Sequence, residues 1–131
     1  MKKEYSLKDW HLNAGVSNDI ICDIVSPIGR KLPTDYEQFL REHDGGEGFI
    51  SSNYLILWKA EQLNAFNREY EVERYAPGLF LFGSDGGGEG YAFDARDVTM
   101  PVVRVPFIGM ELRYANLIAA SFTDLLAQLA K

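Results

Sequence analysis

The residues with the clearest chemical potential lie in one glycine-rich segment. Residues 83–90 read GSDGGGEG, so five of these eight residues are glycine, and Asp85 and Glu89 stand on either side of three consecutive glycines. A phosphate-binding loop needs a lysine and a hydroxyl group at fixed offsets from its glycines, and this segment contains no lysine. The dinucleotide-binding pattern needs a further glycine where Tyr91 stands. The segment therefore argues against nucleotide binding.

The same carboxylates do not make a metal site or a catalytic pair. Calcium takes six or more oxygen ligands, and only Asp85 and Glu89 could contribute from within the loop. Ser84 lacks the Gly-x-Ser-x-Gly arrangement of a hydrolase nucleophile. His11 and His43 are the only histidines, and neither pairs convincingly with a serine or cysteine nucleophile. We expect no enzyme activity, no metal and no cofactor.

The glycines have a structural explanation and a functional one, and both can hold. Glycine adopts positive φ without steric cost, so Gly83, Gly86, Gly87 and Gly88 suit a tight or bulged hairpin. Gly45 and Gly46 similarly form a turn that stops a helix. A loop held on a rigid scaffold can also present Ser84, Asp85 and Glu89 to a protein partner.

Helical spacing of apolar residues predicts several helices around these turns. The first begins after Ser17 and ends at Ser26-Pro27, because the residue before proline avoids the helical conformation. A second begins with Pro33 in its first turn or with a Thr34–Glu37 capping box, and the sequence allows either start. Residues 59–75 form a third, and Ser121 caps the last.

The middle of the chain predicts strands. Residues 54–58 are expected to be buried on both faces, or nearly so. Residues 79–82 and 91–94 enclose the glycine-rich segment as a hairpin, and residues 102–105 form a further strand. This order of helices and strands predicts an α+β fold with a largely antiparallel sheet flanked by helices.

Length and composition place this fold in one domain that spans residues 1–131. The chain has 47% hydrophobic and 24% charged residues, which is typical of a globular protein. Its formal net charge of -6 argues against nucleic-acid binding, which needs clustered lysine and arginine, and it suits a basic partner.

Other features predict a cytoplasmic protein. No signal peptide follows the initial lysines, and no apolar run is long enough to span a membrane. The single cysteine, Cys22, cannot form an intrachain disulfide and is expected to be buried. Trp10 falls in a polar segment that we expect to be loosely held.

Three segments together resemble the SUKH superfamily, in particular its SMI-KNR-type branch. Their order and spacing match that family over about residues 16 to 130, and the glycine-rich segment after an apolar strand is the most specific of them. The segments are LPTDYEQFL with HDGGEG (residues 32–40 and 43–48), FGSDGGGE with YAFD (residues 82–89 and 91–94), and SF-x-DLL (residues 121–126).

The resemblance implies an α+β fold and a protein-binding role without catalysis. Many bacterial members of the superfamily are regarded as immunity proteins that neutralise a secreted toxin, often a nuclease. Fungal relatives regulate cell-wall assembly through protein contacts. The first hypothesis is therefore an immunity protein for a basic toxin, and the alternative is a regulatory or scaffold protein in cell-envelope or signalling processes.

Candidate partner-binding residues follow from charge and from position in loops. Asp85 and Glu89 are the strongest candidates, together with Ser84 in the same loop, and reversing both charges to lysine is expected to weaken binding. Asp44 and Glu47 lie beside the first glycine turn. Trp58 is more typical of a core residue, but it would anchor a partner if it stood at the rim of the sheet. The oligomeric state stays open.

Overall fold

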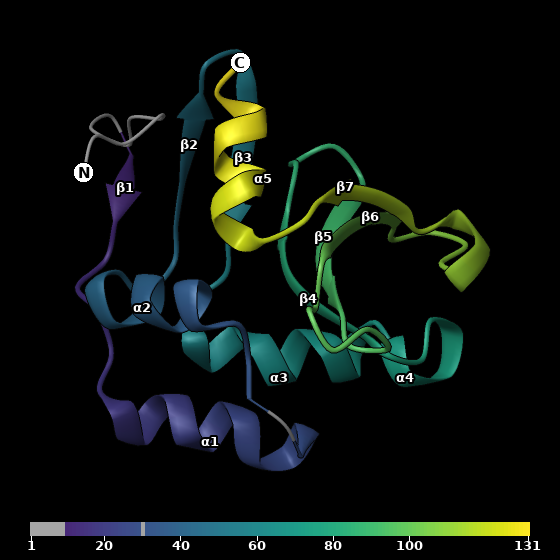
Figure 1. The fold of residues 1–131 in the computed structure, drawn as a ribbon, viewed down its shortest axis with the longest axis horizontal. Helices are drawn as coiled ribbons and strands as arrows, with labels where there is room; N and C mark the ends of the chain where they lie inside the picture. Colours follow the sequence, from purple (N-terminus) through teal and green to yellow (C-terminus); the bar gives the residue numbers. More distant parts are fainter. Residues whose placement is uncertain (1–9, 30) are drawn as a thin grey trace.

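The fold was analysed in a computed structural model that describes residues 10–29 and 31–131 (Figure 1). Within these residues, seven strands form one sheet, and every neighbouring pair is antiparallel. Each strand pairs with the strand that follows it in the chain, so the order across the sheet is β1 to β7. The strands are β1 His11–Leu12, β2 Gly46–Ile50, β3 Asn53–Leu57, β4 Leu79–Ser84, β5 Glu89–Asp94, β6 Val102–Pro106 and β7 Asn116–Ala119.

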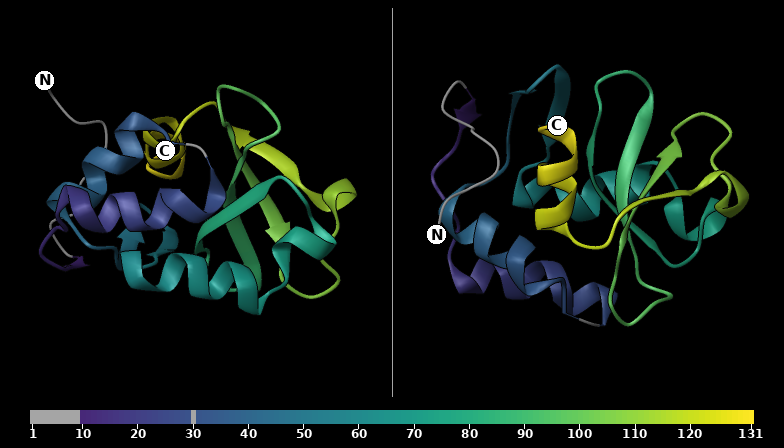
Figure 2. Two further views of the ribbon diagram at one scale, coloured as in Figure 1. Left: turned by 90° about the horizontal axis from the view of Figure 1, so that it is seen from below. Right: turned by 45° about the horizontal axis from the view of Figure 1, so that its top comes forward.

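Helices separate β1 from β2 and β3 from β4, and a further helix follows β7. In Figure 1, α5 overlaps β3 in the view, and both Figure 1 and the right-hand view of Figure 2 show the chain entering α5 from β7. The first two helices lie before β2, and α3 runs alongside β4. The helices are α1 Asn18–Ile28, α2 Thr34–Glu42, α3 Ala60–Glu69, α4 Val72–Tyr75 and α5 Phe122–Leu129, with a 3-10 turn η1 at Leu112–Tyr114. The expected α+β class with its antiparallel sheet is confirmed.

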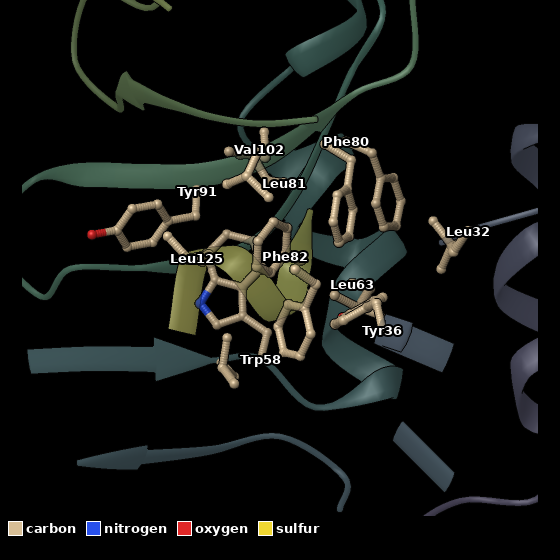
Figure 3. Packing of buried hydrophobic residues seen from close by; sticks show 14 of the residues in the cluster. Leu32, Tyr36, Trp58, Leu63, Phe80, Leu81, Phe82, Tyr91, Val102 and Leu125 are labelled. Carbon is tan, nitrogen blue, oxygen red and sulfur yellow. The ribbon is translucent and has the colours of Figure 1, made fainter. Parts of the chain in front are cut away.

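An aromatic cluster joins α2 and α5 to the sheet. The ring of Tyr36 in α2 lies 5.1–5.4 Å, between centroids, from Phe82 of β4, Phe93 of β5 and Phe122 of α5. The cluster is fully or almost fully buried, and Figure 3 shows two of its members, Tyr36 and Phe82, among the core side chains. Burial of each such ring contributes about 1.5–3 kcal/mol, so these contacts hold the helices on the central strands.

The helix boundaries confirm some sequence predictions and correct others. Ser17 accepts the backbone N–H of Ile20, and Ser121 accepts that of Asp124, so both expected N-caps are present. In contrast, α1 does not end at Ser26-Pro27, because Pro27 lies inside its last turn and Gly29 provides the left-handed C-cap. Helix α2 uses neither predicted start, since Pro33 is the residue before the first helical residue and no side chain caps it.

Three strands were not expected from the sequence. The glycine-containing strand β2 pairs along its whole length with β3, and the short strands β1 and β7 form the two ends of the described sheet. The prediction of a strand buried on both faces was also wrong. In β3, Leu55 and Leu57 are buried, whereas Tyr54 and Ile56 between them are half-buried. The strand therefore has an inner face and a partly open one.

Two further expectations about burial were wrong. Trp10 is only 8% exposed, because its ring lies over Gly48 and its Nε1 donates to the carbonyl oxygen of Phe49 at 2.8 Å. A side chain at position 48 would collide with that ring. Cys22 is exposed, because α1 turns the neighbouring Ile21 and Ile24 into the core instead.

Candidate functional site

The glycine-rich loop between β4 and β5 is folded by its own polar side chains. The hydroxyl of Ser84 accepts the N–H of Gly86 at 2.9 Å and donates to the carbonyl oxygen of Glu89 at 3.1 Å. Oδ1 of Asp85 accepts the N–H groups of Gly87 and Glu89 at 2.7 and 3.2 Å. Ser84 is 8% exposed, so it offers little surface, whereas Asp85 keeps its second carboxylate oxygen without a hydrogen-bond partner in the described chain.

The glycines of this loop meet different structural needs. Gly86 and Gly88 have φ values of 80° and 109°, which side chains rarely adopt. At Gly83 the need is space, because a Cβ atom there would lie 2.4 Å from the carbonyl oxygen of Ile56. Gly87 shows neither requirement. In the earlier turn, Gly45 and Gly46 both have positive φ and both lie against backbone carbonyl oxygens of neighbouring segments.

A second group of residues lies on the partly open face of the β2–β3 hairpin. Phe49 is 65% exposed, and the edge of its ring meets the ring of Tyr54, its partner across the strands, at a centroid distance of 5.0 Å. The hydroxyl of Tyr54 donates to the carboxylate of Glu47 on the same face. This hydrogen bond raises the pKa of Tyr54, because the phenol that donates it must stay protonated.

The glycine-rich loop and the hairpin form one continuous surface. A Cβ atom on Gly86 would lie 3.3 Å from the ring of Tyr54 and 3.8 Å from Ile56, so the loop backbone packs directly against these side chains. Asp85 immediately precedes Gly86 in the loop, and Glu47 is on the same hairpin as Tyr54. We call the surface made by Glu47, Phe49, Tyr54 and Asp85 the acidic aromatic face. It combines an exposed ring with two carboxylates.

Glu89 lies at the other end of the loop and faces a cation. Its carboxylate is 3.8 Å from Nε of Arg104 on β6, and both side chains are partly exposed. Burial raises the pKa of Tyr91, which is opposite Arg104 across β5 and β6, and the nearby guanidinium of Arg104 opposes this effect. Glu89 is therefore partly neutralised within the molecule, which makes it less available to a partner than Asp85.

Asp44 and Trp58 have contacts that tie them to the fold. Oδ1 of Asp44 accepts the N–H of Ala60 at 2.6 Å and so caps the start of α3 from a distant turn. Trp58 is only 7% exposed and packs against the rings of Phe66, Tyr70 and Phe107. The structure thus brings Glu47 and Asp85 together on one surface, and it leaves Asp44 and Trp58 outside that surface.

Sequence reasoning missed the two aromatic members of the acidic aromatic face. Residues 54–57 look like a uniform apolar run, which hides the fact that Tyr54 and Ile56 point to the open side. The signal that could have found Phe49 is the alternation Glu47-Gly48-Phe49, which places Glu47 and Phe49 on the same face once residues 46–50 are recognised as a strand. The two glycines in that segment concealed the strand, because glycine is depleted in strands.

Three arrangements would be relevant to function in the described part of the chain: a metal-ligand group, a histidine paired with a nucleophile, and a membrane-spanning helix. No group of three or more His, Cys, Asp or Glu side chains is placed to bind a metal in residues 10–29 and 31–131. Among the hydrogen bonds of the same residues, no histidine side chain contacts a serine, a cysteine or a carboxylate. None of the described helices is long and apolar enough to cross a bilayer.

Comparison with known protein families identifies the family of this chain. The sequence profile of the SMI1 / KNR4 family (SUKH-1) matches residues 15–128, which is most of the chain. The chain belongs to this family. The matched range of the SUKH-1 domain runs from just before α1 into α5 and therefore includes the whole acidic aromatic face. No curated protein matches the sequence.

Proposed function

We propose that this SUKH-1 domain is a non-enzymatic protein-binding module, and specifically an immunity protein that binds and neutralises a basic toxin domain. The observation that carries the proposal is the acidic aromatic face. An exposed aromatic ring on a surface with two carboxylates suits a protein partner, because aromatic residues dominate binding energy and peripheral charges select and steer the partner. Membership of the SUKH-1 family supports the protein-binding class.

The charge of the whole molecule supports a basic partner. A formal net charge of -6 attracts a cationic protein over a distance and accelerates its association. A toxin that acts on nucleic acid needs a positively charged surface for its substrate. An acidic immunity protein that occupies this surface would exclude the substrate by competition. Such a mechanism requires no catalytic group in the immunity protein.

The immunity function is tested by identifying the partner and then measuring toxicity. The tagged chain is used to capture proteins from its producing organism, which are eluted with increasing salt and identified by mass spectrometry. The captured protein, or its terminal domain, is then expressed in a laboratory host with and without the chain. Growth arrest that the chain relieves supports immunity. Capture of an envelope or signalling protein without toxicity would instead support the alternative regulatory role.

The acidic aromatic face is tested with a variant that removes charge but keeps the local hydrogen bonds. Lysine at position 85 would also remove the acceptor that folds the loop, so Glu47→Gln with Asp85→Asn is the cleaner change, since both amides keep a carbonyl oxygen. We expect the Kd for the captured partner to rise about tenfold and its salt dependence to become shallower. Isothermal titration calorimetry at two salt concentrations measures both.

The matched control removes two charges elsewhere. Asp23→Asn with Glu73→Gln changes exposed acids on α1 and α4 that have no hydrogen bond or ion pair in the described structure. This control lowers the net negative charge by the same amount, so it reports long-range attraction alone. If both double variants weakened binding of the captured partner equally, the acidic aromatic face would not be part of the interface. The immunity function would still be tested separately by the growth experiment.

A further inference from the structure

The last strand of the sheet has an open edge. β7 pairs with β6 through Val102–Ala119, Val103–Leu117 and Arg104–Asn116, and it has no strand on its other side in the described sheet. No backbone hydrogen bond outside the β6 pairing involves residues 116–119 in the part of the chain that the structure describes. The outward N–H and C=O groups of this strand are therefore available to another strand.

This edge is short and a register shift interrupts its pairing with β6, but it has neither charge nor proline to oppose the pairing of another strand. Lysine, proline or an inward-pointing charge usually protects such an edge. The segment from Tyr114 to Ala120 reads YANLIAA and contains no charged residue and no proline. Leu117 in the middle of β7 is 70% exposed, and Tyr114 before it is 45% exposed. An apolar side chain with this exposure would gain free energy if a partner covered it.

The absence of charge on β7 indicates which kind of strand would pair with its open edge. A basic protein would be drawn to the carboxylates of the acidic aromatic face, and β7 offers no charge to complement it. An uncharged apolar strand is matched by another uncharged apolar strand, and a second copy of the chain supplies one. Two copies of β7 can pair antiparallel about a twofold axis, which is the commonest symmetry of soluble homo-oligomers.

We propose that the protein forms a homodimer through antiparallel pairing of β7 with β7 of a second copy. The strand is only four residues long, so the contact is small and the dimer is weak and concentration-dependent. Each copy carries a net charge of -6, so the two copies repel one another at long range. Added salt screens this repulsion and strengthens the dimer.

The salt response separates this proposal from the proposed immunity function. Binding of a basic toxin to the acidic aromatic face weakens when salt is added, whereas dimerisation through β7 becomes stronger. The two proposals can therefore fail independently, since the dimer is measured with the chain alone and needs no toxin.

The test is sedimentation velocity of the full chain from micromolar to millimolar concentration, at low and high salt, with two variants. Leu117→Lys places a positive charge on each strand and brings like charges together across the axis, which destabilises strand pairing. Val98→Lys is the control, because Val98 is an aliphatic residue that is 94% exposed and lies outside β7. We expect the wild type and Val98→Lys to dimerise similarly and Leu117→Lys to dimerise at least about tenfold more weakly.

Hydrogen exchange on the same samples locates the contact. Amides of residues 116–119 should exchange more slowly at high protein concentration in the wild type and not in Leu117→Lys. A wild-type chain that stays monomeric throughout, a dimer that Leu117→Lys leaves intact, or equal weakening by both lysine variants would each overturn the proposal.

Discussion

Tyr36 occupies the centre of the core with a hydroxyl group that has no hydrogen-bond partner in the described structure. Its ring makes three close aromatic contacts, so the side chain is held by packing alone. Burial raises the pKa of Tyr36, and the negative charge of Asp44 adds to this effect. The phenol therefore stays protonated and loses hydrogen bonds to water on folding without replacing them.

Replacing Tyr36 by phenylalanine is therefore expected to preserve or increase stability. The ring contacts remain and an unpaired buried hydroxyl is removed, so the free energy of unfolding should be unchanged or rise by about 1 kcal/mol. Tyr91→Phe is the control, because Tyr91 is equally buried and interacts with Arg104, and it should lose about 1–2 kcal/mol. Urea unfolding of the two variants measures the contrast, and a substantial loss in Tyr36→Phe would show that its hydroxyl has a partner after all.

A single ion pair at the end of β5 gives stability a dependence on pH. The guanidinium of Arg96 donates to both carboxylate oxygens of Asp94 at 2.9 Å. This hydrogen bonding holds the pKa of Asp94 below its ordinary value of 3.8. A carboxylate with a lowered pKa in the folded state contributes stability above the pKa of the unfolded chain, and the contribution disappears as the pH falls through the folded value.

We expect the wild type to lose stability below about pH 3.8. Asp94→Asn should lose less over the same pH range, because it has no carboxylate at this position to protonate. At neutral pH the variant should be less stable than the wild type, and the difference should shrink as acid protonates Asp94 in the wild type. Urea midpoints measured at neutral pH and at progressively lower pH follow this difference. A constant difference across the whole range would mean that the ion pair does not affect stability.

At the scale of elements, Asn67 connects α3 to the sheet. Its amide donates to the carbonyl oxygens of Leu63 and Leu81, and its oxygen accepts the N–H of Leu81 at 2.8 Å. The pairing of β3 with β4 stops at Leu57 and Gly83, so the side chain of Asn67 satisfies the backbone of β4 at a point that β3 does not reach. One amide thus takes the place of a neighbouring strand.

Asn67→Ala should therefore lower the free energy of unfolding by about 1–3 kcal/mol, because the N–H and C=O groups of Leu81 lose their partner. Asn64→Ala on the same helix removes one longer hydrogen bond, 3.3 Å to the carbonyl oxygen of Ile24, and should cost less than about 1 kcal/mol. Thermal and urea unfolding of both alanine variants test the contrast. Alanine raises helix propensity at both positions, so similar losses in the two would mean that the hydrogen bonds of Asn67 to Leu81 contribute no more stability than the single one of Asn64.

Sequence patterns predicted those elements whose signals are local. Helix α5 was predicted with its cap because Ser121 and Asp124 stand three residues apart. The hydroxyl of Ser121 accepts the N–H of Asp124, and the carboxylate of Asp124 accepts the N–H of Ala120. The end of α1 was misjudged because a proline in the last turn was tolerated and Gly29 completed the helix. The strands β2 and β7 were missed because neighbouring strands, rather than local composition, stabilise them.

The candidate site was only partly predictable for the same reason. The sequence pointed to Asp85 and Glu47 as separate acids near glycine turns. Only the three-dimensional contact of Gly86 with Tyr54 shows that they share a surface. Exposure of Phe49 likewise depends on the register of β2 against β3, since that register decides which face each side chain takes. Register and long-range contact are properties of the folded chain.

At the scale of the whole molecule, two surfaces of different character divide the proposed interactions. The acidic aromatic face combines carboxylates with an exposed ring, and the edge of β7 is apolar and uncharged. The calorimetric comparison of the two double variants tests the first, and the sedimentation comparison of the two lysine variants tests the second. Because salt weakens one interaction and strengthens the other, salt concentration would shift the protein between dimerisation and partner binding.

The order of the strands has a consequence for synthesis. Every strand pairs with the one made immediately before it, so the sheet can grow in the sequence in which the ribosome releases the chain. From β4 to β7 and between β2 and β3, the paired strands are also close in the chain, and short-range pairing of this kind favours rapid folding. The pairings of β1 with β2 and of β3 with β4 each span two helices. Helix α5 follows the whole sheet in the chain, and its Phe122 completes the cluster around Tyr36. Until α5 is made, the nascent sheet would carry an incompletely covered aromatic surface, to which chaperones could bind.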